Sequence, residues 1–175
     1  RVDGQKMKEI DAEGIAYENG FVYVTGSHGL ARKSNKLQPS RFFVFRFPVD
    51  EHDGEPTFDI THKDVADEIE RSDVLGPLLE QDDSLGPYAK TSLKENGLNI
   101  EGLAIVDGTL YFGMRAPSVG GDAFILAVSE NCIFGKLECQ PKSHRIALGA
   151  GEGIRDLAGY GNTILVLSGP GSSAG

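Results

Sequence analysis

Tryptophan is absent from this chain of 175 residues, and cysteine and methionine each occur only twice. The two cysteines, Cys132 and Cys139, are too few for a framework of disulfides, and they lack the second pair that a structural zinc site needs. Free thiols are the simpler interpretation of this pair. A local disulfide between them is the alternative that the sequence leaves open.

Basic residues are also scarce, because 17 Lys and Arg stand against 26 Asp and Glu, which gives a formal net charge of −9. Binding to a phosphate backbone needs clustered basic side chains, so this balance excludes nucleic acid as a partner and favours a cationic ligand or a metal. No apolar run approaches the roughly 18 residues of a membrane helix, so we expect a soluble protein without membrane insertion. The compartment stays open between the cytoplasm and export after processing.

Several enzyme signatures are missing as well. The sequence has no Gly-x-Ser-x-Gly elbow, no Walker loop and no His-Glu-x-x-His pair. Residues 149–153 resemble a dinucleotide-binding loop only superficially, because Ile154 stands in the place of the last glycine and the next segment predicts a strand. His52, His62 and His144 show no metal-ligand spacing, so we expect them to be exposed to solvent.

A motif that recurs three times is the main positive feature of the sequence. Its first copy covers residues 13–26, the second lies 88 positions further on, and the third lies 54 positions after the second. Each copy has a short apolar strand, a two-residue turn that tolerates positive φ, and a second strand rich in β-branched and aromatic residues. The turns are Asn19-Gly20, Asp107-Gly108 and Gly161-Asn162. The motif therefore predicts three β-hairpins.

Further strand candidates follow the first two hairpins, at residues 41–47 and 122–128, and near 57–60 and 145–148. Three or four antiparallel strands that recur at about 50 residues are typical of propeller blades. We therefore predict a single all-β domain over residues 1–175, made of β-propeller blades, about two and a half to three of them, with a short helical insertion. So few blades cannot close a ring. Either the natural protein continues beyond Gly175, or self-association with another copy caps the stack.

The insertion that lengthens the first interval covers about residues 61–98. Thr61-x-x-Asp64 has the pattern of a capping box, and Val65 and Ile69 follow at helical spacing, which predicts a helix over about residues 63–71. A second short helix is expected near residues 75–81, with irregular chain to Asn96. Because charges and Gly-Pro pairs interrupt this segment, we expect it to lie outside the sheets as a surface excursion.

Four strings resemble a bacterial family catalogued as domain of unknown function 3616. They are residues 11–16, 94–104, 113–117 and 153–157, and the run from Lys94 to Ala104 is the most specific of them. The resemblance implies a longer parent protein with a propeller-like fold and no established activity. The Glu-Gly-Ile-Ala motif alone is also weakly similar to propellers of the phytase-like esterase kind.

Charged residues stand at one equivalent position of the three hairpins, namely Glu13, Glu101 and Arg155. If the first strand of each repeat is the innermost, these side chains lie at one level around a central funnel. They could hold a metal such as calcium, chiefly through Glu13 and Glu101, or a ligand, with Asp156 and Asn99 as further oxygen donors. The alternative is that they pair with one another and tie the blades together.

Two more candidates follow the second strands of the hairpins. Arg115 follows the second strand of repeat two, and His28 follows that of repeat one, so loop ends on a common face would present them together. A planar guanidinium suits carboxylate or phosphate groups, and a histidine titrates near neutral pH and could transfer protons. The glycines Gly26 and Gly29 near His28 fit a plain tight turn equally well.

Two functions fit these features. The first is a non-catalytic propeller that binds a small molecule or protein partner at the funnel, which agrees with the missing enzyme motifs. The second is a metal-assisted hydrolase of phosphoester or lactone-like esters, in which calcium held by Glu13 and Glu101 polarises the substrate. Propellers host both uses, so fold alone does not choose between them.

Overall fold

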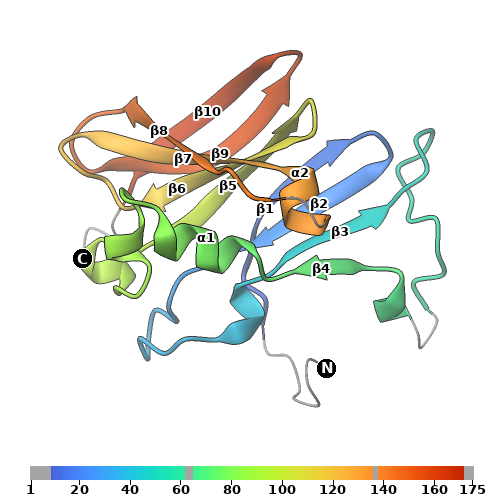
Figure 1. Cartoon of the computed structure of the whole chain (residues 1–175), viewed down its shortest axis with the longest axis horizontal. Coiled ribbons are helices and arrows are strands. Elements are labelled where there is room, and N and C mark those ends of the chain that lie inside the picture. Colours follow the sequence, from blue (N-terminus) through green and yellow to red (C-terminus); the bar gives the residue numbers. More distant parts are fainter. Residues whose placement is uncertain (1–8, 62–64, 136–137, 172–175) are drawn as a thin grey trace.

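The computed structural model describes residues 9–61, 65–135 and 138–171, and Figure 1 shows their arrangement. These residues form three antiparallel sheets. Sheet 1 has the order β1-β2-β3-β4, sheet 2 has the order β5-β6-β7-β8, and sheet 3 pairs β9 with β10. The all-β fold class is therefore confirmed, and the propeller arrangement stays a prediction.

Strands account for most of the regular structure. Sheet 1 contains β1 (Ala12–Glu18), β2 (Phe21–Gly26), β3 (Val44–Pro48) and β4 (Glu70–Ser72). Sheets 2 and 3 contain β5 (Asn99–Val106), β6 (Thr109–Ala116), β7 (Asp122–Ser129), β8 (Lys142–Ala147), β9 (Glu152–Tyr160) and β10 (Thr163–Pro170). The helices are α1 (Leu75–Gln81) and α2 (Glu130–Phe134), and the 3-10 turns are η1 (Pro39–Arg41), η2 (Val65–Asp67), η3 (Gly86–Tyr88) and η4 (Leu93–Glu95). No helix in the described stretches is long and apolar enough to cross a membrane.

The repeated motif forms three hairpins, as predicted. Asn19 and Gly20 have φ values of 49° and 78°, and Asp107 and Gly108 have 49° and 67°, which are the two positive values that a type I′ turn requires. The strand pairs share one register, and the equivalent partners are Ile15 with Val24, Leu103 with Phe112, and Leu157 with Val166. The spacing of the motif in the sequence thus corresponds to one repeated local structure.

The first strands of the three sheets lie next to one another, with β1 against β5 and β5 against β9. A glycine permits each approach. A Cβ atom added to Gly14 would lie 2.7 Å from Cβ of Leu103, and one added to Gly102 would lie 2.8 Å from Cγ of Leu157. Because these two contacts join equivalent positions, successive sheets pack on one another at the same height.

Two hydrophobic cores fill the spaces between the sheets. The larger one lies on the face of sheet 2 toward sheet 1 and includes Tyr23, Leu103, Phe112, Phe124 and Leu126. The smaller one lies between sheets 2 and 3 and includes Ala104, Ala123, Ile125, Ile154 and Leu157. Sheet 2 is therefore covered on both faces, which explains why nearly every residue of β5 is buried.

The predicted outer strands are confirmed except in one place. β3, β7 and β8 overlap the candidates at residues 41–47, 122–128 and 145–148. The strand expected near residues 57–60 is wrong, because the Asp59 carboxylate accepts hydrogen bonds from the backbone N–H and the hydroxyl of Thr61 and closes a local turn. The fourth strand of sheet 1 is β4, which the Arg46 guanidinium holds by two hydrogen bonds to Glu70, at 3.0 and 2.9 Å.

The segment expected to be a surface excursion is part of the core, so that expectation is wrong. Leu75 and Leu79 on α1 and Leu85 beyond it are buried in the larger core. The second short helix is confirmed as α1. The helix expected over about residues 63–71 is wrong in its described part, because η2 is followed there by β4. Lys63 and Asp64, at the start of that expected helix, lie outside the described residues.

Cys132 and Cys139 form a disulfide. This is the alternative that the sequence left open beside the free thiols. Cys132 lies on α2 and is buried in the larger core. The bridge therefore ties the chain that follows α2 to that core.

Truncation of Leu85 tests the role of residues 65–98 in the core. We expect Leu85→Ala to lower the free energy of unfolding by about 2–5 kcal/mol, because it leaves a cavity at a fully buried site. Urea denaturation followed by circular dichroism measures the change. The matched control is Leu37→Ala at an exposed leucine, which should change the stability little. Equal losses of stability in both variants would mean that residues 65–98 do not contribute to the core.

Candidate functional site

A β-bulge occurs at the same place in each of the three hairpins. The register shifts between Ala12 and Gly14, between Ile100 and Gly102, and where Ile154 and Asp156 pair with successive residues of β10. On the first strands, the residues left without a partner are Glu13, Glu101 and Arg155, and Arg115 on β6 is left without one as well. A bulge re-aims its side chain and interrupts the ladder, so the fold gives these three charged positions a common local geometry.

Glu101 lies at the centre of a cluster of arginines. Its side chain is only 7% exposed, and its Oε1 and Oε2 atoms lie 2.7 Å from Nη1 of Arg115 and Nε of Arg155, respectively. Nη2 of Arg32 lies 3.8 Å from Oε1. Arg115 comes from β6, Arg155 from β9, and Arg32 from the loop after β2. One buried carboxylate therefore connects all three sheets.

The same arginines hold the end of β10. Nε of Arg115 donates a hydrogen bond to the carbonyl oxygen of Gly171 at 2.8 Å, and Nη1 of Arg155 donates one to that of Pro170 at 3.2 Å. Each of these two guanidiniums thus contacts Glu101 through one nitrogen atom and a carbonyl oxygen through another. The cluster thus fixes the third hairpin to the second.

Glu13 adds a second carboxylate near this cluster. Burial raises the pKa of Glu13, and the negative charges of Asp11 and Glu101 raise it further, while Arg32 and Arg115 act in the opposite direction. Its protonation therefore occurs at a higher pH than that of an ordinary glutamate. Within the predicted ring, Glu101 and Arg155 form an ion pair. Glu13 lies close enough to Glu101 for that negative charge to raise the pKa of Glu13.

The contacts of Glu101 favour the ion-pair alternative over a metal site. Both of its carboxylate oxygens face guanidinium groups, and calcium needs about six to eight oxygen ligands. Among residues 9–61, 65–135 and 138–171, no group of three or more metal-ligating side chains is found. Asp156 accepts a hydrogen bond from the backbone N–H of Leu157 at 2.8 Å. The calcium site stays a prediction without a supporting contact.

His28 lies inside the protein, away from the surface that a proton carrier would need. Its Nδ1 atom lies 3.0 Å from the carbonyl oxygen of Gly26, and its ring packs edge-on against Phe42. Burial lowers the pKa of His28 to about 4, and the Gly26 hydrogen bond offsets this only in part. Its φ of 50° fits the tight turn. No hydrogen bond or ion pair between His28 and Arg115 is found in the described chain, so the predicted shared anion site has no support.

The burial of His28 predicts a loss of stability in mild acid. The folded pKa of about 4 lies below the unfolded value of about 6.5, so the unfolded state takes up the proton first as the pH falls. We expect a loss of about 1.4 kcal/mol per pH unit between these two values. Asparagine tolerates a positive φ, so the variant His28→Asn should fold and should lose this dependence of the free energy of unfolding on pH. The measurement is urea denaturation at pH 7 and pH 5.

His52→Asn provides the control for this experiment, because His52 is exposed. It should keep the pH dependence of the wild type, which includes every other titrating group. If His28→Asn and His52→Asn had the same dependence, the acid sensitivity would come from groups other than His28.

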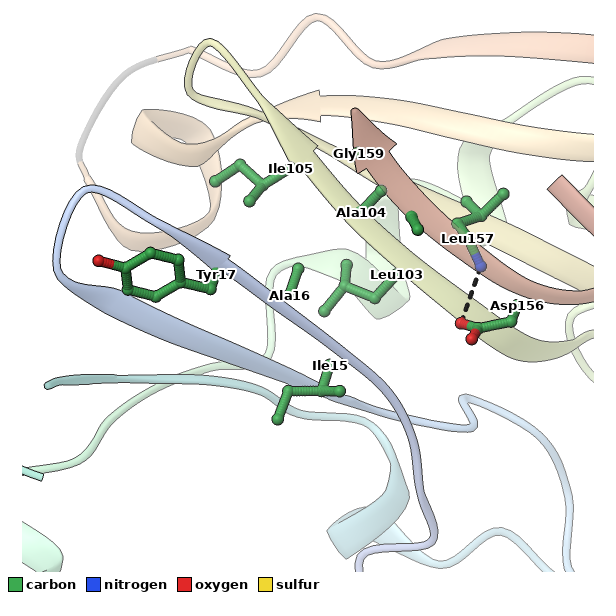
Figure 2. Close-up of a pocket in the computed structure, with 10 residues that line it drawn as sticks. Ile15, Ala16, Tyr17, Leu103, Ala104, Ile105, Asp156, Leu157 and Gly159 are labelled. Atoms are coloured by element: carbon green, nitrogen blue, oxygen red, sulfur yellow. Dashed lines mark hydrogen bonds between the residues drawn. The ribbon is translucent and has the colours of Figure 1, made fainter. Parts of the chain in front are cut away.

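An apolar groove lies beside the bulges, between β1, β5 and β9, and was not foreseen from the sequence. Figure 2 shows the residues that line it on the three strands. Its volume is about 320 Å³. Its lining consists of equivalent triplets from the three hairpins, together with Asp156. The triplets are Ile15-Ala16-Tyr17, Leu103-Ala104-Ile105 and Leu157-Ala158-Gly159. In the sequence, the alternation of large and small residues after the bulge position is the signal that indicates this groove.

Neutralising Glu101 tests whether the arginine cluster is structural. We expect Glu101→Gln to lower the free energy of unfolding by about 1–3 kcal/mol, because Arg115 stays buried without its charge partner. The control is Glu80→Gln, which breaks the exposed Glu80–Lys90 pair and should cost about 0.5 kcal/mol. Calcium should leave the melting temperature of every variant unchanged. A calcium-induced rise in the wild type that Glu101→Gln abolishes would instead favour the metal site.

Comparisons with known proteins agree with the family resemblance of the sequence. Comparison with curated proteins finds no match. The family model described as "Protein of unknown function (DUF3616)" matches residues 1–174. Because this match covers almost the whole chain, the protein belongs to the DUF3616 family.

Proposed function

We propose that this protein is a non-catalytic binding module and that the groove between β1, β5 and β9 receives the apolar part of a small molecule or a peptide. The observation that carries the proposal is the groove itself, a hollow of about 320 Å³ lined by residues of three strands. Binding pockets are concave and mostly apolar, with a few polar groups at defined places. The groove has the concave form of such a pocket, and Asp156 is a polar group in its lining.

The propeller hypothesis predicts where in the protein the groove lies. If each hairpin begins a blade, β1, β5 and β9 are the innermost strands, and the groove is the wall of the central funnel. The repeated contacts Gly14–Leu103 and Gly102–Leu157 support this arrangement, because blades of a propeller pack on their neighbours in an equivalent way. A ligand at this place would contact every blade of the chain.

The charges beside the groove indicate what kind of ligand it takes. The bulge cluster contains three guanidiniums, those of Arg32, Arg115 and Arg155, against the carboxylates of Glu101 and Glu13. The Arg32 side chain is more than half exposed and only loosely paired, so it is free to meet an anion. The ligand class is therefore an apolar body with one acidic group.

An amphipathic anion such as 8-anilinonaphthalene-1-sulfonate tests this site, because it combines an apolar ring system with one sulfonate. The folded protein should enhance its fluorescence in a saturable way. Ile15→Ser should weaken binding several-fold, because Ile15 is 67% exposed and forms a wall of the groove. Arg32→Gln should weaken it as well, and added salt should reduce the difference between Arg32→Gln and wild type.

Ile60→Ser is the matched control, since Ile60 has the same exposed fraction of 67% and lies outside the groove lining. It should bind the probe as the wild type does. Equal binding by Ile15→Ser and Ile60→Ser would show that the probe uses another surface and would remove the groove from the proposal.

A further inference from the structure

The short helix α2 connects sheet 2 to the outer strands of sheet 1. It follows β7 directly and lies against β4 (Figure 1). The carboxylate of Glu130 accepts a hydrogen bond of 2.7 Å from the hydroxyl of Tyr23 on β2 and forms an ion pair with Arg46 on β3. At the other end of α2, the centroid of the Phe134 ring lies 4.6 Å from the guanidinium carbon of Arg46. A helix of five residues thus contacts three strands of the neighbouring sheet.

These contacts converge on Arg46. Its guanidinium also donates two hydrogen bonds to Glu70 of β4, so one side chain joins β3, β4 and α2. The side chains of Arg46 and Glu130 are only 20% and 23% exposed. Tyr23 is 2% exposed, and Glu130 is the partner that the structure gives to its hydroxyl. Movement of α2 away from sheet 1 would therefore leave this buried hydroxyl without its hydrogen bond and would take one of two carboxylate partners from Arg46.

Helical structure alone is too weak to keep α2 in this place. Isolated helices shorter than about 12–15 residues are marginal in water, and the preceding residue Ser129 provides no side-chain cap. What anchors α2 is the burial of Cys132 and Ile133 in the larger core, together with the disulfide from Cys132 to Cys139. Cys139 packs against the same core. The disulfide is therefore the covalent support of a helix whose other contacts are non-covalent.

We propose that the Cys132–Cys139 disulfide is a redox-sensitive latch, and that its reduction by a dithiol releases α2 from sheet 1. The two sulfur atoms differ in access, because Cys132 is 4% exposed whereas Cys139 is only partly buried. A thiolate of the dithiol attacks Sγ of Cys139 and forms a new S–S bond, while the Cys132–Cys139 bond breaks and Cys132 leaves as a thiolate that takes up a proton.

The second thiol of the reductant completes the reaction. Its thiolate attacks the reductant sulfur of the mixed disulfide, and Cys139 leaves as a thiolate that takes up a proton. The protein thereby gains two electrons and two protons, and the dithiol is oxidised to an internal disulfide. Neither step needs a further oxidant or a metal.

A dithiol fits this site better than a monothiol. After the first step Cys132 stays close to Cys139, because the two Cα atoms lie 5.1 Å apart in the folded chain. The Cys132 thiol can therefore attack the mixed disulfide and restore the original bond. A second thiol on the reductant competes with this reversal, because it is held next to the same bond at a high effective concentration. This inference concerns α2 only and does not depend on a ligand in the groove.

Hydrogen exchange of the oxidised and the reduced full chain, followed by mass spectrometry, tests the proposal. Dithiothreitol, a dithiol, should reduce the disulfide at neutral pH without denaturant, and the mass after alkylation counts the thiols. Reduction should speed the exchange of amides in α2 by about tenfold or more, and that of amides in β3 in the same direction. The amides of β5 and β6 should keep their rates, since these two strands pair with each other.

Two variants separate the latch from general effects of the reductant. Cys139→Ser removes the disulfide at its more accessible end, so it should exchange as fast as the reduced wild type, and dithiothreitol should change it no further. Glu130→Gln keeps the disulfide but weakens the contacts with Arg46 and Tyr23, so reduction should affect β3 less than in the wild type. Glu138→Gln is the matched control at an exposed glutamate and should respond to reduction as the wild type does.

The opposite results overturn the proposal. Two free thiols before any reductant is added would remove the bridge itself, and a disulfide that dithiothreitol leaves intact in the folded protein is not open to a dithiol. Equal exchange of α2 and β3 in the oxidised and the reduced chain would show that the disulfide supports no latch. Faster exchange in all three sheets at once would make the bridge a support of the whole fold. An equal response of Glu130→Gln and wild type in β3 would show that the disulfide does not act through the Glu130 contacts.

Discussion

The buried carboxylate of Glu101 ties sheets 2 and 3 of this protein together. A charge removed from water is costly unless it is paired, and Glu101 finds its partners on three different elements, namely Arg115 on β6, Arg155 on β9 and Arg32 after β2. A shift of sheet 3 relative to sheet 2 would leave a buried charge with fewer partners. The cluster therefore specifies how the sheets are placed relative to one another, beyond any net stability that it adds.

The bulges and glycines explain how such a cluster and the groove come to lie side by side. Each bulge turns a charged residue away from the regular ladder at the start of a first strand. The next residue is Gly14 or Gly102 in the first two hairpins, and it lets the following sheet approach closely. Large and small residues then alternate along the strands and leave the hollow. One short motif thus places charge, close packing and an apolar cavity in a fixed order.

The ends of the sheet stack differ from its middle. Leu103 is fully buried between sheets 1 and 2, whereas its equivalent Ile15 is mostly exposed. At the other end, β10 exposes Val166 where sheet 2 buries Phe112. The same motif is therefore a core element in the middle and an open surface at both ends.

The sequence by itself determined the hairpins, their register and α1. Asn19-Gly20 and Asp107-Gly108 favour the turn within two residues, and alternation of side chains determines which face each neighbour takes, so both signals are local. Only the tertiary structure decided that β4 joins sheet 1, that Leu85 enters the core and that Glu101 meets three arginines. These outcomes depend on which distant surfaces meet, and neither periodicity nor turn chemistry encodes that choice.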